Sequence, residues 1–119
     1  LGENLFVRSK EIYDGAIPSG NSVSALNFIR LSRILHRSDY EDISYDIIDA
    51  FSHKLNRYSS GSSVLLQVIN YIEGPSYEVI IKGSRKKSKH LIKQIQQHKQ
   101  PNKVLIFNND NNNMFSFLH

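Results

Sequence analysis

The sequence predicts a mainly helical α+β protein, in which about three helices precede a small strand-helix-strand unit with parallel strands. Apolar residues recur every three or four positions in three segments before residue 74, as they do in amphipathic helices. The period then changes, because the runs 77–82 and 103–107 are short and rich in β-branched residues, which is typical of strands. A helical segment between two neighbouring strands makes them parallel. We expect residues 1–75 and 76–119 to form one structural unit.

The first predicted helix is more apolar than a surface helix. It runs from about Ser22 to Leu35, and only a narrow polar stripe interrupts its apolar circumference. The apolar residues are Val23, Leu26, Phe28, Ile29, Leu31, Ile34 and Leu35. A helix with this pattern is buried on more than one side. We therefore expect it to pack against neighbours that this chain does not contain.

Local signals place the ends of the next two helices. Ser38-Asp39-Tyr40-Glu41 matches a capping box, and the helix that follows runs to about Leu55. The third helix has its cap at Ser62 or Ser63 and ends at Gly74-Pro75. The apolar stripes of the two helices are Tyr40, Ile43, Ile47 and Phe51 in the second, and Val64, Leu65, Val68, Ile69 and Ile72 in the third.

Charge is distributed unevenly along the chain. Residues 1–78 carry 7 basic and 10 acidic side chains, whereas residues 79–119 carry 8 basic and 1 acidic side chain. After the first strand, Gly83 forms a turn and Ser84 caps a basic helix that extends to about His98, with Leu91, Ile92 and Ile95 facing inward. A glycine turn that leads into a helix N-terminus can hold a phosphate group. The candidate anion-binding residues are Ser84, Arg85, Lys86 and Lys87.

The sequence resembles a known family in three segments. DGAIPSGNSVSALNFIRLSRI, from Asp14 to Ile34, is similar to a segment of the spermatogenesis-associated protein 20 family of thioredoxin-domain-containing proteins. The preceding KEIYDG and the later YEVIIKG and PNKVLIF resemble that family's closing segment in the same order. The resemblance spans about Lys10 to Phe107, and it implies the C-terminal end of a longer protein, consistent with a chain that begins at Leu1. The family's thioredoxin-like domain is absent, so we assign no redox activity.

The resemblance also implies an architecture. Residues 1–75 would be the last helices of an (α/α) toroid similar to N-acylglucosamine 2-epimerases and related sugar enzymes, and residues 76–119 a small basic segment with an Asn-rich tail. In such a toroid the loop between Asp14 and Ser22 would face a central cavity. Its ligand-binding groups would be Asp14, Ser19, Asn21 and Ser22, with Asp14 the best candidate for an acid or base. Fold analogy alone is a weak warrant for function.

The same loop residues can also be explained by purely structural roles, as turn formers and helix caps. Pro18 sets a backbone angle, the glycines supply turns, and Asn21 or Ser22 caps the following helix. The loop residues are thus the common turn formers as well as good partners for sugar hydroxyls. Which role applies depends on what the side chains contact in the fold.

Several other kinds of site have no support in the sequence. The chain has no cysteine, which excludes disulfides and thiolate chemistry. Its five histidines show no metal-ligand spacing, so we expect no metal and no cofactor. The carboxylates Asp39, Glu41, Asp42, Asp46 and Asp49 mostly lie off the apolar stripe, as on a solvated helix face. No apolar run is long enough to cross a bilayer, and we expect a cytoplasmic protein without membrane contacts.

Two functional hypotheses follow. In the first, the chain handles carbohydrate only within a full-length toroid, is inactive alone, and forms a homodimer when its toroid partners are missing. In the second, it is a non-catalytic module whose basic segment 84–103 contacts an acidic partner, phosphate or nucleic acid. Nucleic acid is the least favoured of these, because the segment lacks interleaved aromatic residues.

Overall fold

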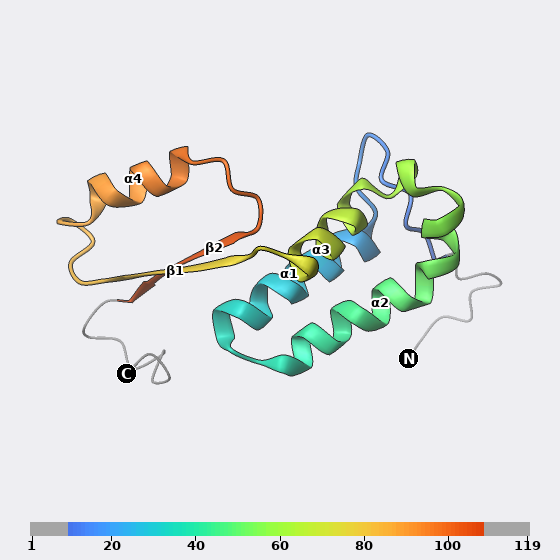
Figure 1. Ribbon diagram of the computed structural model, residues 1–119, viewed down its shortest axis with the longest axis horizontal. Helices are drawn as coiled ribbons and strands as arrows, with labels where there is room; N and C mark the ends of the chain where they lie inside the picture. The colour runs from blue at the N-terminus through green and yellow to red at the C-terminus, as the bar shows by residue number, and fades with distance from the viewer. Residues whose placement is uncertain (1–9, 109–119) are drawn as a thin grey trace, which may run out of the picture.

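The computed structural model describes residues 10–108, which form a mainly helical α+β fold (Figure 1). This confirms the predicted fold class. The elements in chain order are α1 (Gly20–Leu35), α2 (Ser38–Arg57), the 3-10 turn η1 (Ser59–Gly61), α3 (Ser63–Glu73), β1 (Tyr77–Lys82), α4 (Lys89–Gln97) and β2 (Lys103–Asn108). The predicted Asn-rich tail beyond Asn108 lies outside the described residues.

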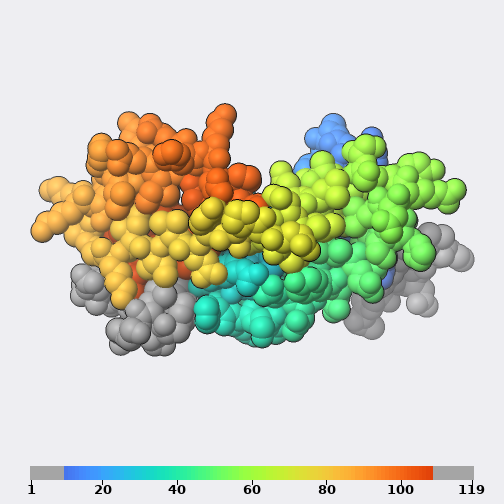
Figure 2. Space-filling view, viewed as in Figure 1, coloured from blue at the N-terminus to red at the C-terminus, as the bar shows by residue number. Residues whose placement is uncertain are grey.

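Helices α1, α2 and α3 form one end of the molecule, and the strands with α4 form the other (Figure 1 and Figure 2). The two strands are parallel, as predicted, with Tyr77 opposite Lys103 and Lys82 opposite Asn108. Val104 of β2 belongs to the core cluster of the helices, and the Asn102 amide donates a hydrogen bond of 3.0 Å to the Asn70 carbonyl at the end of α3. These contacts attach the strand pair to the helices.

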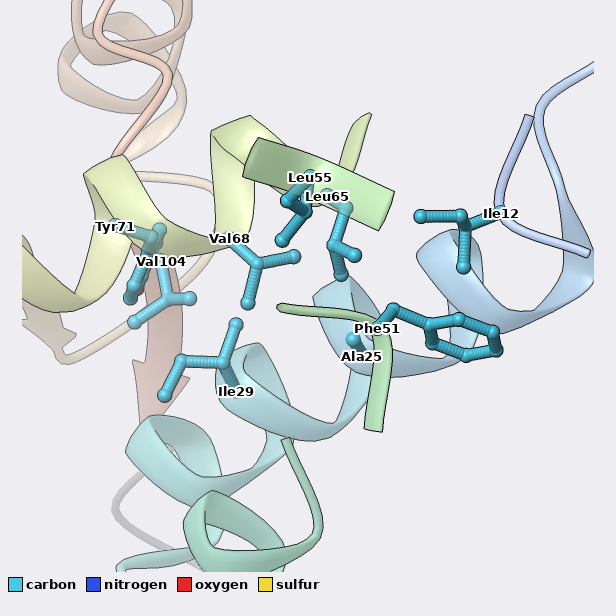
Figure 3. Packing of buried hydrophobic residues seen from close by; sticks show 9 residues of the cluster. All are labelled: Ile12, Ala25, Ile29, Phe51, Leu55, Leu65, Val68, Tyr71 and Val104. Atoms are coloured by element: carbon cyan, nitrogen blue, oxygen red, sulfur yellow. The ribbon is translucent and has the colours of Figure 1, made fainter. Parts of the chain in front are cut away.

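Helix α1 is the centre of the helical layer, because α2 and α3 both pack against it. Its buried side contains Ser22, Ala25, Ile29 and Ser32, three of which are small and let the neighbouring helices approach closely. The buried Ser44 hydroxyl of α2 donates 3.0 Å to the Ala25 carbonyl. Figure 3 shows the surrounding cluster, which consists of Ile12, Ala25, Ile29, Phe51, Leu55, Leu65, Val68, Tyr71 and Val104.

One side of α1 remains in solvent. Val23, Leu31 and Leu35 are each 37–38% exposed, and with Asn27 they follow one another at intervals of four residues, which places them on one side of the helix. The prediction that the partners of α1 lie outside this chain is therefore wrong for most of its surface. It still applies to this exposed side, which we call the α1 outer stripe (Val23, Leu31 and Leu35).

The predicted caps of α1 and α2 are wrong. Helix α1 begins at Gly20, and its cap is the Ser19 hydroxyl, which accepts from the Ser22 amide, whereas we expected Asn21 or Ser22. The capping box at the start of α2 is not formed, because Arg37 takes the cap position without a side-chain bond. Glu41 instead accepts two hydrogen bonds of 2.9 Å from Arg33 across the α1–α2 turn. A bidentate pair of this kind holds the carboxylate away from its own helix start.

The basic helix also differs from the prediction. It begins at Lys89, because residues 85–88 form a turn in which the Ser88 amide donates 3.0 Å to the Ser84 carbonyl. Ser84 is therefore not the cap. No residue of α4 is buried, and Leu91, expected to face inward, is 49% exposed, while Ile92 and Ile95 are partly buried. Helix α4 lies above the two strands in Figure 1, and little of its apolar surface is buried.

Candidate functional site

The loop before α1 is organised around the Asp14 carboxylate. Oδ1 accepts a hydrogen bond of 2.9 Å from the Ser19 amide, within the loop. Oδ2 accepts from the Val64 amide at 2.8 Å and, more weakly, from the Leu65 amide at 3.4 Å. Since these amides belong to the first turn of α3, Asp14 caps a helix that begins about fifty residues later. The position of the cap at Ser62 is as predicted, but its own side chain makes no capping bond.

The other three predicted site residues also have partners within the fold. The Ser19 and Ser22 hydroxyls lie 2.8 Å apart, and both residues are buried. The Asn21 side-chain amide donates 2.7 Å to the Glu11 carbonyl. The fold therefore brings Asp14, Ser19 and Ser22 together, while Asn21 turns toward the segment that precedes the loop.

These bonds define what the loop can do chemically. A carboxylate has about four acceptor positions, and three backbone amides occupy the oxygens of Asp14. A sugar hydroxyl could use the remaining position. The turn-and-cap interpretation accounts for every bond just given. The ligand-binding and catalytic roles of the four residues stay predictions.

The predicted anion-binding residues lie in the turn before α4. Ser84, Arg85, Lys86 and Lys87 are all exposed, and the three bases precede the helix rather than occupy its first turn. Their positive charges still lie near the positive end of the α4 dipole, and Lys89 occupies the first helical position, so the arrangement is locally unfavourable. The helix start itself lies five residues after Ser84, so a phosphate group held by the helix amides would be centred on Lys89 instead.

The structure reveals a groove that the sequence analysis missed. It has a volume of about 800 Å³ and lies between the segment that leads into the loop and the carboxyl end of α2. Tyr13 and Tyr58, which are 71% and 66% exposed, line it together with the cationic side chains Lys54 and Arg57. In Figure 1 these two parts of the chain lie at the same end of the helical layer. Two tyrosines 45 positions apart give no recognisable motif, so only the fold could unite them.

Three ionisable residues elsewhere have shifted pKa values, namely Tyr71 and the Arg37–Asp39 pair. Burial raises the pKa of the Tyr71 hydroxyl, and the positive charges of Arg33 and Arg30 partly oppose that effect. This hydroxyl has no hydrogen-bond partner among residues 10–108. At the exposed start of α2, the hydrogen bond from Arg37 lowers the pKa of the Asp39 carboxyl. Among residues 10–108, no group of three or more histidine or acidic side chains could hold a metal ion.

Comparison with known proteins shows which proteins this chain is similar to. The matched proteins are of the spermatogenesis-associated protein type, and the match covers 89% of the chain. Human spermatogenesis-associated protein 20 is 33% identical over 108 residues, and its rat and mouse counterparts are 32% identical over the same length. The family resemblance of the loop and strands is thereby confirmed. The chain spans only 14% of the length of these relatives.

Two further comparisons gave no match. No protein-family model matches the chain, and no solved structure matches it. None of the helices in the described part of the chain is long and apolar enough to cross a membrane.

Proposed function

We propose that this chain is one part of a longer toroid protein of the cytoplasm that binds or modifies carbohydrate, and that the chain alone has no catalytic activity. The observation that carries the proposal is the match of nearly the whole chain to a small part of much longer relatives. The sugar class comes from the toroid architecture that the resemblance implies, which is similar to that of sugar epimerases. Sugar isomerisation and sugar hydrolysis are the reactions to test.

The α1 outer stripe supports the first half of this proposal. Val23, Leu31 and Leu35 form an apolar face that nothing in residues 10–108 covers fully. Apolar faces that remain exposed commonly mark contact sites for other protein surfaces. In the proposed toroid the next helix of the ring would pack on this face, and the loop at Asp14 would lie toward the cavity.

The test compares the 119-residue chain with full-length human spermatogenesis-associated protein 20. Each protein is incubated with a panel of neutral and N-acetylated sugars and disaccharides, and product formation is followed by anion-exchange chromatography. We expect turnover by the full-length protein and none by the chain alone. Turnover of any sugar by the 119-residue chain would contradict the proposal, and so would inactivity of the full-length protein on the whole panel.

A second candidate function rests on the exposed bases Arg85, Lys86, Lys87 and Lys89. They follow one another within five residues, and none of them forms an ion pair within the described part of the chain. We propose as an alternative that segment 84–103 binds an acidic partner or phosphate without catalysis. Such binding would be electrostatic and would weaken steeply with added salt.

Heparin affinity measured at increasing salt concentration tests this alternative. The Lys86→Glu/Lys87→Glu variant should elute at clearly lower salt than the unaltered chain. The Lys10→Glu/Ser38→Glu/Gln67→Glu variant changes exposed residues outside the basic segment by the same net charge and serves as the control. Equal elution of the two variants would show that only net charge matters and would rule out a binding segment.

A further inference from the structure

The groove beside the Asp14 loop presents two aromatic rings to solvent. Tyr13 and Tyr58 are 71% and 66% exposed, and both line the same groove. The other two exposed tyrosines among residues 10–108, Tyr45 and Tyr77, are each 46% exposed. An exposed ring can stack on the apolar face of a ligand while its hydroxyl remains available for a hydrogen bond. The groove therefore has two flat surfaces of the kind that bind small ring molecules.

The Tyr13 ring, most of which is in solvent, lies against two glycine positions. A Cβ atom at Gly15 would lie 2.7 Å from the ring carbon Cε1, and one at Gly61 would lie 3.0 Å from Cδ2 on the opposite edge. A side chain at Gly15 would therefore force the ring to shift, whereas one at Gly61 would require a displacement of only a few tenths of an ångström. The Asp14 amide also donates 2.7 Å to the Gly61 carbonyl, so the glycines that flank the ring are themselves connected. Pre-organisation of this kind reduces the entropy lost on binding.

The charges at the groove favour an anionic ligand. Lys54 and Arg57, from the last two turns of α2, line the groove, and neither forms an ion pair within the described residues. The Arg57 guanidinium lies 5.8 Å from the centre of the Tyr58 ring, and the Lys54 ammonium donates 3.2 Å to the Lys10 carbonyl. Among residues 10–108, Glu11 is the one carboxylate in the lining. The two cations outnumber it, and each keeps donors for a ligand.

We propose that this groove is a binding site for a sugar ring that carries an anionic group. The tyrosine rings would contact the C–H face of the sugar, and Arg57 and Lys54 would bind its phosphate or carboxylate. The volume of about 800 Å³ lies within the range of small-molecule sites, roughly 300–1,000 Å³. The choice of a sugar rests on the proposed function, whereas the aromatic and cationic character of the site does not.

Nuclear magnetic resonance titration of the 119-residue chain tests the site. The probes are glucose 6-phosphate, glucuronate, glucose and inorganic phosphate. We expect glucose 6-phosphate or glucuronate to shift the ring signals of Tyr13 and Tyr58, with at least about tenfold tighter binding than glucose. The stronger of the two charged sugars identifies the anionic group as phosphate or carboxylate.

Variants separate the roles of the residues. Tyr13→Ala and Gly15→Ala should each weaken the binding of the charged sugar about tenfold, the second because its methyl group displaces the ring. Lys54→Gln/Arg57→Gln should remove the preference for charged over neutral sugar. Tyr45→Ala, which alters an exposed tyrosine that does not line the groove, is the control and should bind normally. Unchanged core signals from Val68 and Val104 verify that each variant is folded.

Three results would overturn the proposal. The first is the absence of any shift with either charged sugar at millimolar concentration. The second is an equal response to inorganic phosphate, which would reduce the groove to a simple anion site. The third is a change in the tyrosine signals on dilution without ligand, which would assign the groove to a second copy of the chain. None of these results bears on turnover by the full-length relative, so the two proposals can fail separately.

Discussion

At the scale of single residues, Asp14 connects parts of the chain that are far apart in sequence. Its two oxygens accept from amides of the loop and of the first turn of α3. Helix amides in the first turn have no partner within their own helix, and a buried or half-buried carboxylate is a strong acceptor for them. The residue that the sequence suggested as an acid or base is therefore also a determinant of stability.

We expect Asp14→Asn to lower the free energy of unfolding by about 1–3 kcal/mol, because the new amide group presents a donor to one of the backbone amides. Urea denaturation followed by circular dichroism measures the change. Asp46→Asn is the matched control, since Asp46 is exposed and has no hydrogen bond or ion pair within residues 10–108. Equal urea midpoints for the two variants would show that the hydrogen bonds of Asp14 do not stabilise the fold.

We expect the buried hydroxyl of Tyr71 to make the protein less stable at alkaline pH. Burial raises the pKa of its hydroxyl above the usual value of 10.0, so the folded state retains this proton where the unfolded state releases it. The resulting stabilisation is complete below about pH 10 and is lost as the pH rises toward the folded pKa. In Tyr71→Phe this contribution is absent, and the stability should fall less steeply above pH 10.

The same variant has a second expected outcome at neutral pH. The Tyr71 hydroxyl is buried without a hydrogen-bond partner in the described part of the chain, so its removal should leave stability at pH 7 unchanged or slightly increased. Urea midpoints at pH 7 and at intervals between about pH 9 and 11 check both statements. A decline of the same steepness in both proteins would contradict the assignment to Tyr71.

At the scale of elements, α4 differs from the three other helices because none of its residues is buried. A helix without buried apolar contacts can open at little cost to the rest of the fold. By contrast, α3 contributes Leu65, Val68 and Tyr71 to the core, and all three are nearly inaccessible to solvent.

Hydrogen exchange should therefore be faster for the amides of α4 than for those of α1 and α3. Leu91→Ala should change the free energy of unfolding by less than about 0.5 kcal/mol, whereas Leu65→Ala should reduce it by about 2–5 kcal/mol. The two substitutions remove the same atoms from different surroundings. Similar losses for both, or protection of α4 equal to that of α3, would contradict this view of the fold.

At the scale of the whole molecule, the α1 outer stripe is the surface through which we expect two copies of the chain to associate. Homodimerisation through Val23, Leu31 and Leu35 stays a prediction, because an exposed apolar face can also be tolerated in solution. We expect light scattering to show a mass that rises with concentration and a monomer for Leu31→Glu. Leu66→Glu alters a leucine of the same 38% exposure on α3 and should leave the association unchanged. A monomeric mass for the unaltered chain at every concentration would contradict dimerisation.

The sequence predicted the elements better than their contacts. Strand 77–82, the end of α3 at Gly74 and the parallel pairing are as expected, because each depends on local periodicity and on turn formers. The cap of α2 was not predictable, because Glu41 can accept either from a backbone amide at the start of its own helix or from a distant cation. The fold brings Arg33 within 2.9 Å of Glu41, and the second pairing forms. The start of α4 was misplaced for a similar reason: several residues after Gly83 can begin a helix, and Ser84 instead closes a turn.

The sequence by itself determined the order of helices and strands, the basic character of the second half and the family to which the chain is related. These properties come from the spacing and identity of neighbouring residues. Only the tertiary structure decided that Asp14 caps α3, that α1 has neighbours from its own chain, and that Tyr13 and Tyr58 share a groove. Each of these contacts joins segments distant in sequence, and the free energy that forms them comes from packing of the whole core rather than from any local pattern.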